Sequence, residues 1–294
     1  MPFTKENIEE IKKSYKLYQD IGDTISFKLK ESIEKMTRYF EQEENKDSKA
    51  LVMVSGGKDS TVTLGLAAKA IGKDNIIAVT APFENDHSDI LTTSREIIKY
   101  FGIPEENYIH SPIKIMAKDY IVNNSKNALI EALGQYQEQV LEWNMTKPED
   151  RNLAARIRML KAYYLAQKYN ARVINTSNLS ENIIGWFTKW GDCVGDYYPI
   201  HNYTASEVVL LGLEMGIPEK YMFRVPDDGL IGNSDEEALG FTYNELDEWI
   251  WRVKEKQRLG DVNNIFDYYC GFEILPEKMK KRFESAMHKR FITF

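Results

Sequence analysis

The sequence predicts an α/β protein built on a doubly wound parallel sheet with added helices. Three observations carry this prediction. Short apolar runs alternate with segments of helical length, polar signatures stand directly after several of those runs, and 43% apolar residues in a chain of 294 suffice for a substantial core. Strands separated by helices of this length are typical of βαβ units, whose parallel sheet is covered on both faces.

The N-terminal helical segment covers about residues 1–45. Apolar residues such as Ile8, Ile11 and Tyr15 recur there at helical spacing. Their spacing predicts one or two amphipathic helices. The polar run at residues 41–49 then predicts a loop.

Strands and helices alternate from residue 50 onward. Strands are predicted at residues 50–54, 76–80, 108–110 and 171–175, and helices at residues 61–71, 88–101, 127–143 and 152–169. The last third is helical and punctuated by turns, and it includes a helical C-terminal part at about 242–294. Because no convincing linker or repeat occurs, residues 1–294 are predicted to form a single domain. In such sheets ligands bind beyond the carboxyl ends of the strands.

The composition narrows the function classes. A formal net charge of -7 argues against a general nucleic-acid binder, which carries a basic footprint. No apolar run approaches the length of a bilayer span, and the charged N-terminus lacks the apolar stretch of a signal peptide. Two cysteines, Cys193 and Cys270, favour a reducing cytoplasm over a secreted disulfide scaffold. Neither they nor the four histidines show zinc-ligand spacing.

The strongest local signal is the loop between the first predicted strand and the helix after it. This loop consists of Ser55, Gly56, Gly57, Lys58, Asp59 and Ser60. Glycines let the backbone adopt positive φ and approach an anion, the helix start offers unpaired N–H groups, and the serine hydroxyls add donors. The loop therefore predicts a pyrophosphate cradle. It is not a Walker A loop, because Val52 stands where that motif needs glycine and Asp59 follows the lysine.

Asp59 adds a second kind of chemistry to this loop. A carboxylate beside a phosphate cradle is unfavourable unless a cation lies between them, so Asp59 is interpreted as a magnesium ligand. The alternative is a tight strand–helix turn that merely uses glycine and serine.

The glycine loop resembles the SGGxDS loop of the ATP pyrophosphatases, which split ATP between its α and β phosphates and transfer AMP to a substrate. The resemblance implies a Rossmann-like fold of the adenine-nucleotide alpha-hydrolase type, with ATP as co-substrate along the loop. The loop alone does not choose among the NAD, GMP, asparagine and argininosuccinate synthetases of that superfamily.

Further stretches resemble the ammonia-dependent NAD synthetases. They are the segment 152–159 (NLAARIRM), the segment 175–181 (NTSNLSE), the aromatic stretch 185–192 with Asp196, the segment 234–247, and the terminal run of His288, Lys289 and Arg290. Together with the glycine loop they cover nearly the whole chain in the right order. Several ordered motifs are far more specific than any one of them.

The resemblance implies roles for individual residues. Thr176 joins the glycine loop in binding ATP, and Glu181 completes the Mg²⁺ site with Asp59. The residues implied for binding deamido-NAD are Arg156, Lys189, Asp196, His288 and Lys289. From the residues alone, alternatives stay open: Thr176 as part of a helix N-cap, Glu181 as a surface residue, and the aromatic side chains at 186–190 as core or interface.

The function that the resemblance implies is an ATP-dependent amidation. The carboxylate of deamido-NAD attacks the α-phosphorus, pyrophosphate leaves, and ammonia converts the acyl adenylate to NAD and AMP, with no covalent nucleophile from the protein. Loops at 85–89 and 227–234 are candidate lids that exclude water. The alternatives are another ligase of the superfamily with a different carboxylate substrate, and a nucleotide-binding regulator without turnover.

Two further expectations concern the nitrogen source and the assembly. About fifty residues precede the glycine loop, too few for the amidase domain of glutamine-dependent synthetases, so free ammonia is expected. The apolar surface of the helices at 129–143 and 159–169, together with the resemblance, predicts a symmetric homodimer.

The sequence departs from the family pattern at two positions expected at ATP. Ala205 follows Thr204 where the family usually has lysine, and Asp227 follows Pro226 where it usually has serine or threonine. Both changes are expected to weaken ATP binding, because charge-assisted contacts are among the stronger ones. Lys58 either takes over part of the missing cationic role or points to solvent.

Overall fold

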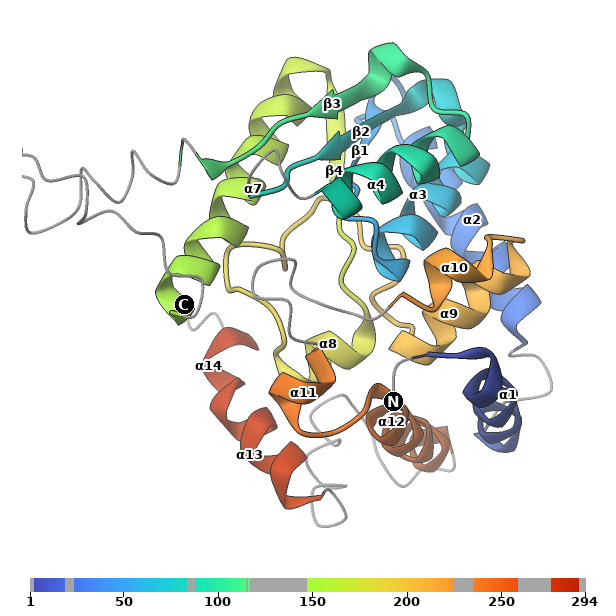
Figure 1. Ribbon diagram of the computed structural model, residues 1–294. Helices are drawn as coiled ribbons and strands as arrows, with labels where there is room; N and C mark the ends of the chain where they lie inside the picture. The colour runs from blue at the N-terminus through green and yellow to red at the C-terminus, as the bar shows by residue number, and fades with distance from the viewer. Residues whose placement is uncertain are drawn as a thin grey trace, which may run out of the picture.

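A parallel sheet surrounded by helices forms the centre of the molecule (Figure 1). The computed structural model describes residues 3–18, 24–83, 88–114, 116, 147–224, 235–258 and 276–290. In the N-terminal half the elements are α1 (Lys5–Tyr18), α2 (Ile25–Glu41), β1 (Lys49–Met53), α3 (Lys58–Ile71), η1 (Lys73–Asn75), β2 (Ile76–Thr80), α4 (Ser88–Tyr100), η2 (Glu105–Asn107) and β3 (Tyr108–His110). They are followed by α7 (Pro148–Lys168), β4 (Ala171–Ile174), α8 (Leu179–Ile184), α9 (Ala205–Glu214), α10 (Glu219–Met222), α11 (Asp235–Leu239), α12 (Tyr243–Arg258), α13 (Glu277–Ser285) and α14 (Met287–Arg290).

The four strands have the order β3-β2-β1-β4, and each neighbouring pair is parallel. Leu51 of β1 pairs with Ile77 of β2 on one side and with Val173 of β4 on the other. The strand order therefore reverses between β1 and β4. In open α/β sheets the crevice at the carboxyl ends of two such strands is where ligands bind. The predicted fold class is confirmed.

Helices cover both faces of the sheet. Leu51, Ile77 and Val173 pack with residues of α7, including Ala162 and Leu165. The alternate strand residues Ala50, Val52, Ile76 and Ala78 belong to a larger cluster with α2, α3 and α9. Successive residues of a strand point to opposite faces, so a continuous apolar run serves both layers.

The predicted elements agree with the structure to within a few residues where it describes them. The predicted strand at 50–54 lies at Lys49–Met53, and the N-terminal segment forms the two helices α1 and α2. The helix expected at 61–71 begins at Lys58, and the helix expected at 152–169 begins four residues earlier at Pro148. Proline suits a first helical turn, because its missing N–H has no partner to lose there. The helix expected at 127–143 lies outside the described residues.

The N-terminal and C-terminal helices share the central core. One hydrophobic cluster contains Phe3, Leu64 of α3, Leu246 of α12 and Phe283 of α13. The assignment of residues 1–294 to one domain stays a prediction, and this shared cluster supports it.

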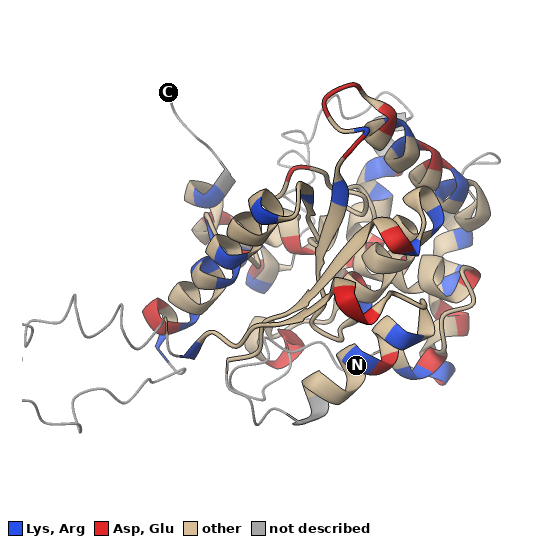
Figure 2. Ribbon diagram, turned by 90° about the horizontal axis from the view of Figure 1, so that it is seen from above, with Lys and Arg blue, Asp and Glu red and all other residues tan. Residues whose placement is uncertain are grey.

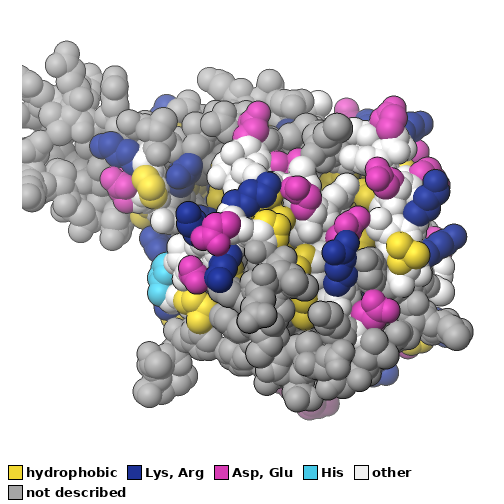
Figure 3. Space-filling model, turned by 90° about the horizontal axis from the view of Figure 1, so that it is seen from below, with side chains coloured by type: hydrophobic (Ala, Val, Ile, Leu, Met, Phe, Trp, Pro, Cys, Tyr) yellow, Lys and Arg dark blue, Asp and Glu magenta, His cyan; other side chains and the backbone are white. Residues whose placement is uncertain are grey.

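Charged residues lie mainly on the helices and loops around the sheet (Figure 2). On the face seen in Figure 3, basic and acidic side chains of the described residues are interspersed and do not form one basic surface. None of the described helices combines the length and the apolar composition needed to cross a bilayer.

Candidate active site

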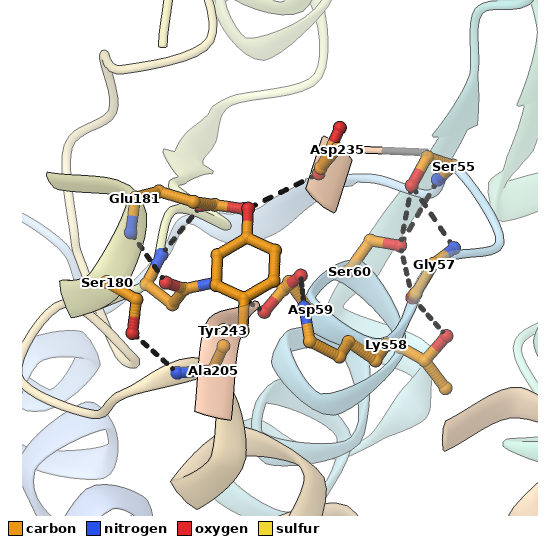
Figure 4. A network of polar contacts seen from close by, with 12 residues as sticks. Ser55, Gly57, Lys58, Asp59, Ser60, Ser180, Glu181, Ala205, Asp235 and Tyr243 are labelled. Atoms are coloured by element: carbon orange, nitrogen blue, oxygen red, sulfur yellow. Dashed lines mark hydrogen bonds and ion pairs between the residues drawn. The ribbon is translucent and has the colours of Figure 1, made fainter. Parts of the chain in front are cut away.

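The glycine loop connects β1 to α3 at the point where the strand order reverses. Figure 4 shows residues of this loop together with Asp59, Glu181 and Tyr243. Gly56 has φ +85°, a left-handed conformation that favours glycine. The hydroxyls of Ser55 and Ser60 lie 3.1 Å apart, and the Gly57 amide donates to Ser55 Oγ at 3.3 Å. Gly57 is the N-cap of α3 and has no side chain to bond the first-turn amides. The loop therefore presents backbone donors and hydroxyls at a helix start, as anion binding requires.

Two carboxylates predicted to hold a metal ion are joined by one asparagine. Asp59 Oδ1 accepts a hydrogen bond from Asn178 Nδ2 at 3.0 Å. Asn178 is the N-cap of α8, and its backbone N–H donates to Glu181 Oε2 at 3.1 Å. Since Asp59 follows β1 and Glu181 follows the neighbouring strand β4, the two strand ends bring them to one place. The alternative that Glu181 is an ordinary surface residue is wrong.

Asp235 joins Asp59 and Glu181 in what we call the carboxylate cluster. Burial, and then the charge of Asp59, raise the pKa of Glu181 well above its ordinary value. Tyr243 Oη donates to Asp235 Oδ2 at 3.3 Å, and both residues are buried. Burial and the charge of Asp235 likewise raise the pKa of Tyr243. The carboxylates thus repel one another at a site that a cation would stabilise.

Lys58 is the cation that the structure places in this cluster. Its side chain is 3% exposed, so the alternative that it points to solvent is wrong. Its Nζ lies 2.7 Å from Asp59 Oδ2, and 5.5 Å from the ring centroid of Tyr243. Burial by itself would lower the pKa of Lys58, but the charges of Asp59 and Glu181 raise it. The expectation that Lys58 contacts ATP phosphate stays a prediction.

Ala205, which stands where the family usually carries lysine, is buried at the start of α9. Thr204 is the N-cap of α9, and Ala205 is the fully buried first residue of that helix. The Ala205 amide donates to Ser180 Oγ at 2.9 Å, and Ser180 in turn donates to the buried carboxylate of Asp247. Asp247 also accepts from the Ser206 amide at 2.7 Å. These contacts fix the start of α9 against α8.

Thr176 stands just beyond the end of β4 and is partly buried. Since the N-cap of α8 is Asn178, the alternative that Thr176 caps the helix is wrong. A position at the carboxyl end of a strand next to β1 keeps Thr176 within the candidate site.

A second group of predicted residues surrounds the aromatic segment, residues 185–190. Lys289 Nζ donates to the carbonyls of Gly185 and Phe187 at 2.8 and 2.6 Å. Lys189 Nζ donates to the His288 carbonyl at 2.9 Å. The α13–α14 part of the chain is thereby held against the aromatic segment. The structure brings these predicted residues together and commits both ammonium groups to backbone oxygens.

Arg156 contacts this segment, whereas Asp196 contacts β4 and α7. Arg156, on α7, is exposed and donates from Nε to the Lys189 carbonyl at 3.3 Å. Asp196 Oδ2 accepts from the Val173 amide at 2.7 Å, and its Oδ1 accepts from Tyr163 Oη at 3.3 Å. Asp196 is thus attached to the edge of β4, whereas Arg156 reaches the aromatic segment directly.

The aromatic side chains of the segment differ in burial, since Trp186 packs against the main hydrophobic cluster, Phe187 is partly buried and Trp190 is exposed. Trp190 is 51% exposed and has φ +62°. The Trp186 ring lies 4.8 Å from the Arg282 guanidinium carbon, and Lys289 Nζ lies 5.4 Å from the Phe187 ring. Trp186 and Phe187 thus each have a cation close to the ring.

Sequence reasoning gave no site role to Asn178, Asp235 or Tyr243. Asn178 carried a usable signal, because Asn followed three residues later by Glu is a capping-box pattern that predicts the start of a helix. Asp235 and Tyr243 carried none beyond their place in a motif, since only the packing of α11 and α12 brings them to the glycine loop. Cys193 is a half-buried free thiol. Asp227, Cys270 and the candidate lids lie outside the described residues, apart from the backbone of residues 88 and 89 at the start of α4.

A parallel sheet with a glycine loop and paired carboxylates at its strand-order reversal defines a nucleotide-binding α/β protein. The model of the NAD synthase family matches residues 28–292. The chain therefore belongs to the NAD synthase family. The NH(3)-dependent NAD(+) synthetase of Methanocaldococcus jannaschii is 35% identical over 254 residues, which cover 81% of this chain and 91% of the relative. That of Pyrococcus horikoshii is 30% identical over 260 residues, covering 88% and 91%.

Solved structures show the same fold. An NMN synthetase from Francisella tularensis superposes with a TM-score of 0.64 at 25% identity and covers 90% of this chain and 97% of its own. An NH3-dependent NAD synthetase from Campylobacter jejuni gives a TM-score of 0.62 at 20% identity, with 91% and 94% covered. At that identity the second likeness concerns the fold alone.

Proposed function

We propose that this protein is an ammonia-dependent ligase that uses ATP to adenylate the carboxylate of deamido-NAD and releases NAD, AMP and pyrophosphate. The observation that carries the proposal is the meeting of the glycine loop with Asp59 and Glu181 at the ends of β1 and β4. Membership of the NAD synthase family and the names of the curated relatives support the reaction and the use of ammonia.

Magnesium fits the residues at this site. Asp59 and Glu181 repel each other, and a divalent ion between them would relieve that repulsion. Within the described part of the chain no group of three or more His, Cys, Asp or Glu side chains is arranged to hold a metal ion. Two carboxylates suffice for Mg²⁺, which commonly takes one or two carboxylates plus phosphate oxygens. Bound there, the ion would neutralise charge on the departing pyrophosphate.

The chain's own residues would supply binding and placement. Backbone amides at the start of α3 and the hydroxyls of Ser55 and Ser60 would bind the phosphates, with Thr176 beside them. Asn178 holds the two metal-binding carboxylates in fixed orientation through one side-chain and one backbone hydrogen bond. Positioning of this kind, and not a covalent nucleophile, would carry the rate increase.

Deamido-NAD would bind along the aromatic segment. Trp190 offers a half-exposed ring and Arg156 is exposed on α7, while Asp196 lies at the edge of β4, where it contacts Tyr163 of α7. Lys189 would reach the dinucleotide from the segment itself, and His288 and Lys289 from the neighbouring C-terminal helix α14. Support comes from the shared location of four separately predicted residues, Arg156, Lys189, His288 and Lys289, at the aromatic segment.

We also infer a homodimer and a cytoplasmic location. Leu160 and Tyr164 lie one turn apart on α7 and are 56% and 67% exposed, which gives that helix an apolar outer stripe. An exposed stripe of this kind suits a self-complementary contact between two copies. Light scattering at assay concentration tests the dimer, and a monomer there contradicts it. The cytoplasmic location rests on the low cysteine count alone.

Pyrophosphate release tests the reaction. The purified protein is given ATP and Mg²⁺ with deamido-NAD or nicotinic acid mononucleotide, and with ammonia or glutamine. Release with deamido-NAD and ammonia is expected. Equal rates with glutamine would contradict the proposal that ammonia is the nitrogen source. A preference for the mononucleotide would move this chain toward the solved NMN synthetase. If neither carboxylate leads to pyrophosphate release, the alternative of a nucleotide-binding regulator without turnover is favoured.

A further inference from the structure

A buried lysine stands among the acidic groups of the proposed nucleotide site. Lys58 Nζ makes an ion pair of 2.7 Å with Asp59 Oδ2, and the Lys58 side chain is 3% exposed. The rings of Tyr243 and Phe3 lie 5.5 and 5.9 Å from the ammonium group. Such a burial is costly for an ammonium unless opposite charges face it. Asp59, Glu181 and Asp235 all act on Lys58 electrostatically, so the carboxylate cluster is that opposite charge.

Both oxygens of the Asp59 carboxylate are already engaged. Oδ2 accepts from Lys58, and Oδ1 accepts from Asn178. A divalent ion arriving from solution would compete with the lysine for Asp59 and would feel its positive charge at short range. A nucleotide brings several negative charges to the same place, which offsets the charge of the lysine.

We propose that Lys58 is a positioning residue that serves as the resident cation of the carboxylate cluster, so that a divalent ion enters the site together with the nucleotide's phosphates and not from free solution. The inference rests on the proposed function for the identity of the nucleotide site. It assigns to Lys58 a contact with Asp59, which is distinct from the contact with phosphate that the sequence suggested.

The test measures binding of Mn²⁺ to the nucleotide-free protein by electron paramagnetic resonance. Removing the charge in Lys58→Met is expected to tighten Mn²⁺ binding about tenfold or more, because a unit charge a few ångströms away is lost. With α,β-methylene-ATP present, and with the Mn²⁺ chelated by free nucleotide measured in a protein-free sample and subtracted, wild type is expected to bind Mn²⁺ at least about tenfold more tightly than without it. The difference between the variant and wild type should then shrink.

Lys28 provides a matched control. It is also a buried lysine, with Nζ 2.6 Å from Glu207 Oε1 and a side chain that is 8% exposed, but its ion pair joins α2 to α9. Lys28→Met should lose stability and leave Mn²⁺ affinity unchanged. A purely structural role for Lys58 would give the same pattern in Lys58→Met.

Two outcomes overturn the inference. The first is Mn²⁺ affinity in folded Lys58→Met that equals wild type or matches Lys28→Met. The second, which needs only the wild-type protein, is Mn²⁺ binding that does not depend on α,β-methylene-ATP. The proposed function fails separately, through absence of pyrophosphate release with deamido-NAD, while the Mn²⁺ measurement is made without any turnover.

Discussion

The carboxylate cluster and the aromatic segment lie in the same candidate site but are held in opposite ways. In the cluster, side chains bind side chains: Lys58 to Asp59, and Asn178 to Asp59. At the aromatic segment, lysine side chains bind backbone carbonyls. Lys189 of the segment binds a carbonyl of α14, and Lys289 of α14 binds two carbonyls of the segment. The first arrangement fixes charges, whereas the second fixes the path of the chain.

This difference separates two kinds of functional residue. Under the proposed function a charge in the cluster would act directly on phosphate or metal, so its removal should affect the reaction more than the fold. A lysine whose ammonium group bonds backbone carbonyls holds a segment in place. It can bind a ligand only if it gives up those hydrogen bonds. Changes at the aromatic segment should therefore appear first in local order and in substrate affinity.

The largest expected effect is on the cluster. Asp59→Asn should lower pyrophosphate release by about 10²–10³-fold with the fold retained, because one preorganised charge is lost where charge develops. Glu181→Gln should also impair release, and less severely. The exposed Asp74→Asn, at η1, is the matched control and should leave the rate unchanged. Near-normal, magnesium-dependent turnover in Asp59→Asn would contradict the metal assignment.

The next largest expected effect is a loss of stability when the packing between the aromatic segment and the C-terminal helices is disturbed. Gly185 has φ +63°, and a Cβ there would collide with the Cβ of Ala286. Gly185→Ala should cost about 2–4 kcal/mol of unfolding free energy from backbone strain and overpacking together. Gly216→Ala, which follows the C-terminus of α9 at φ +80°, has nothing within 4 Å of the added methyl group and should cost less. Urea unfolding of both variants measures the difference, and equal losses would remove the collision as its cause.

The pH dependence of stability tests Asp247, which accepts hydrogen bonds from Ser180 of α8 and Ser206 of α9. Burial raises its pKa to about 6, although Ser180 and Ser206 donate hydrogen bonds to it. Since the folded pKa lies above the unfolded one, the stability that this group contributes is complete below about pH 4 and is lost as the pH rises through about 6. The unfolding free energy of wild type relative to Asp247→Asn should fall by up to about 3 kcal/mol between about pH 4 and pH 7. A difference that is flat, or that grows with pH, would show the carboxyl to be stably ionised.

The smallest effects are expected from the two lysines at the aromatic segment. Lys289→Met loses two short bonds, and should raise the Michaelis constant for deamido-NAD about tenfold, as expected for charge-assisted bonds. Lys189→Met loses one bond and should change it less. Hydrogen exchange of residues 185–190 should quicken in the same order. Lys281→Met, which removes a solvent-exposed pair with Glu277, should change neither quantity; an equal effect there would point to net charge alone.

The sequence by itself determined the sheet, the glycine loop and the family. These features are local: an apolar run of strand length, glycines that permit Gly56 its positive φ, and a helix start at Lys58 depend on residues next to one another. The order of short motifs along the chain added the family, which the comparisons confirm.

Only the tertiary structure decided how these residues meet. Lys58 was read from sequence as either a phosphate contact or a solvated side chain, and its burial against Asp59 depends on Tyr243, which lies far along the chain. Asp235 and Lys289 likewise find their neighbours through the packing of α11 to α14. The sequence specifies which side chains are charged. Long-range packing sets the dielectric around each charge and the partner that balances it. Burial then decides whether that charge must be paired.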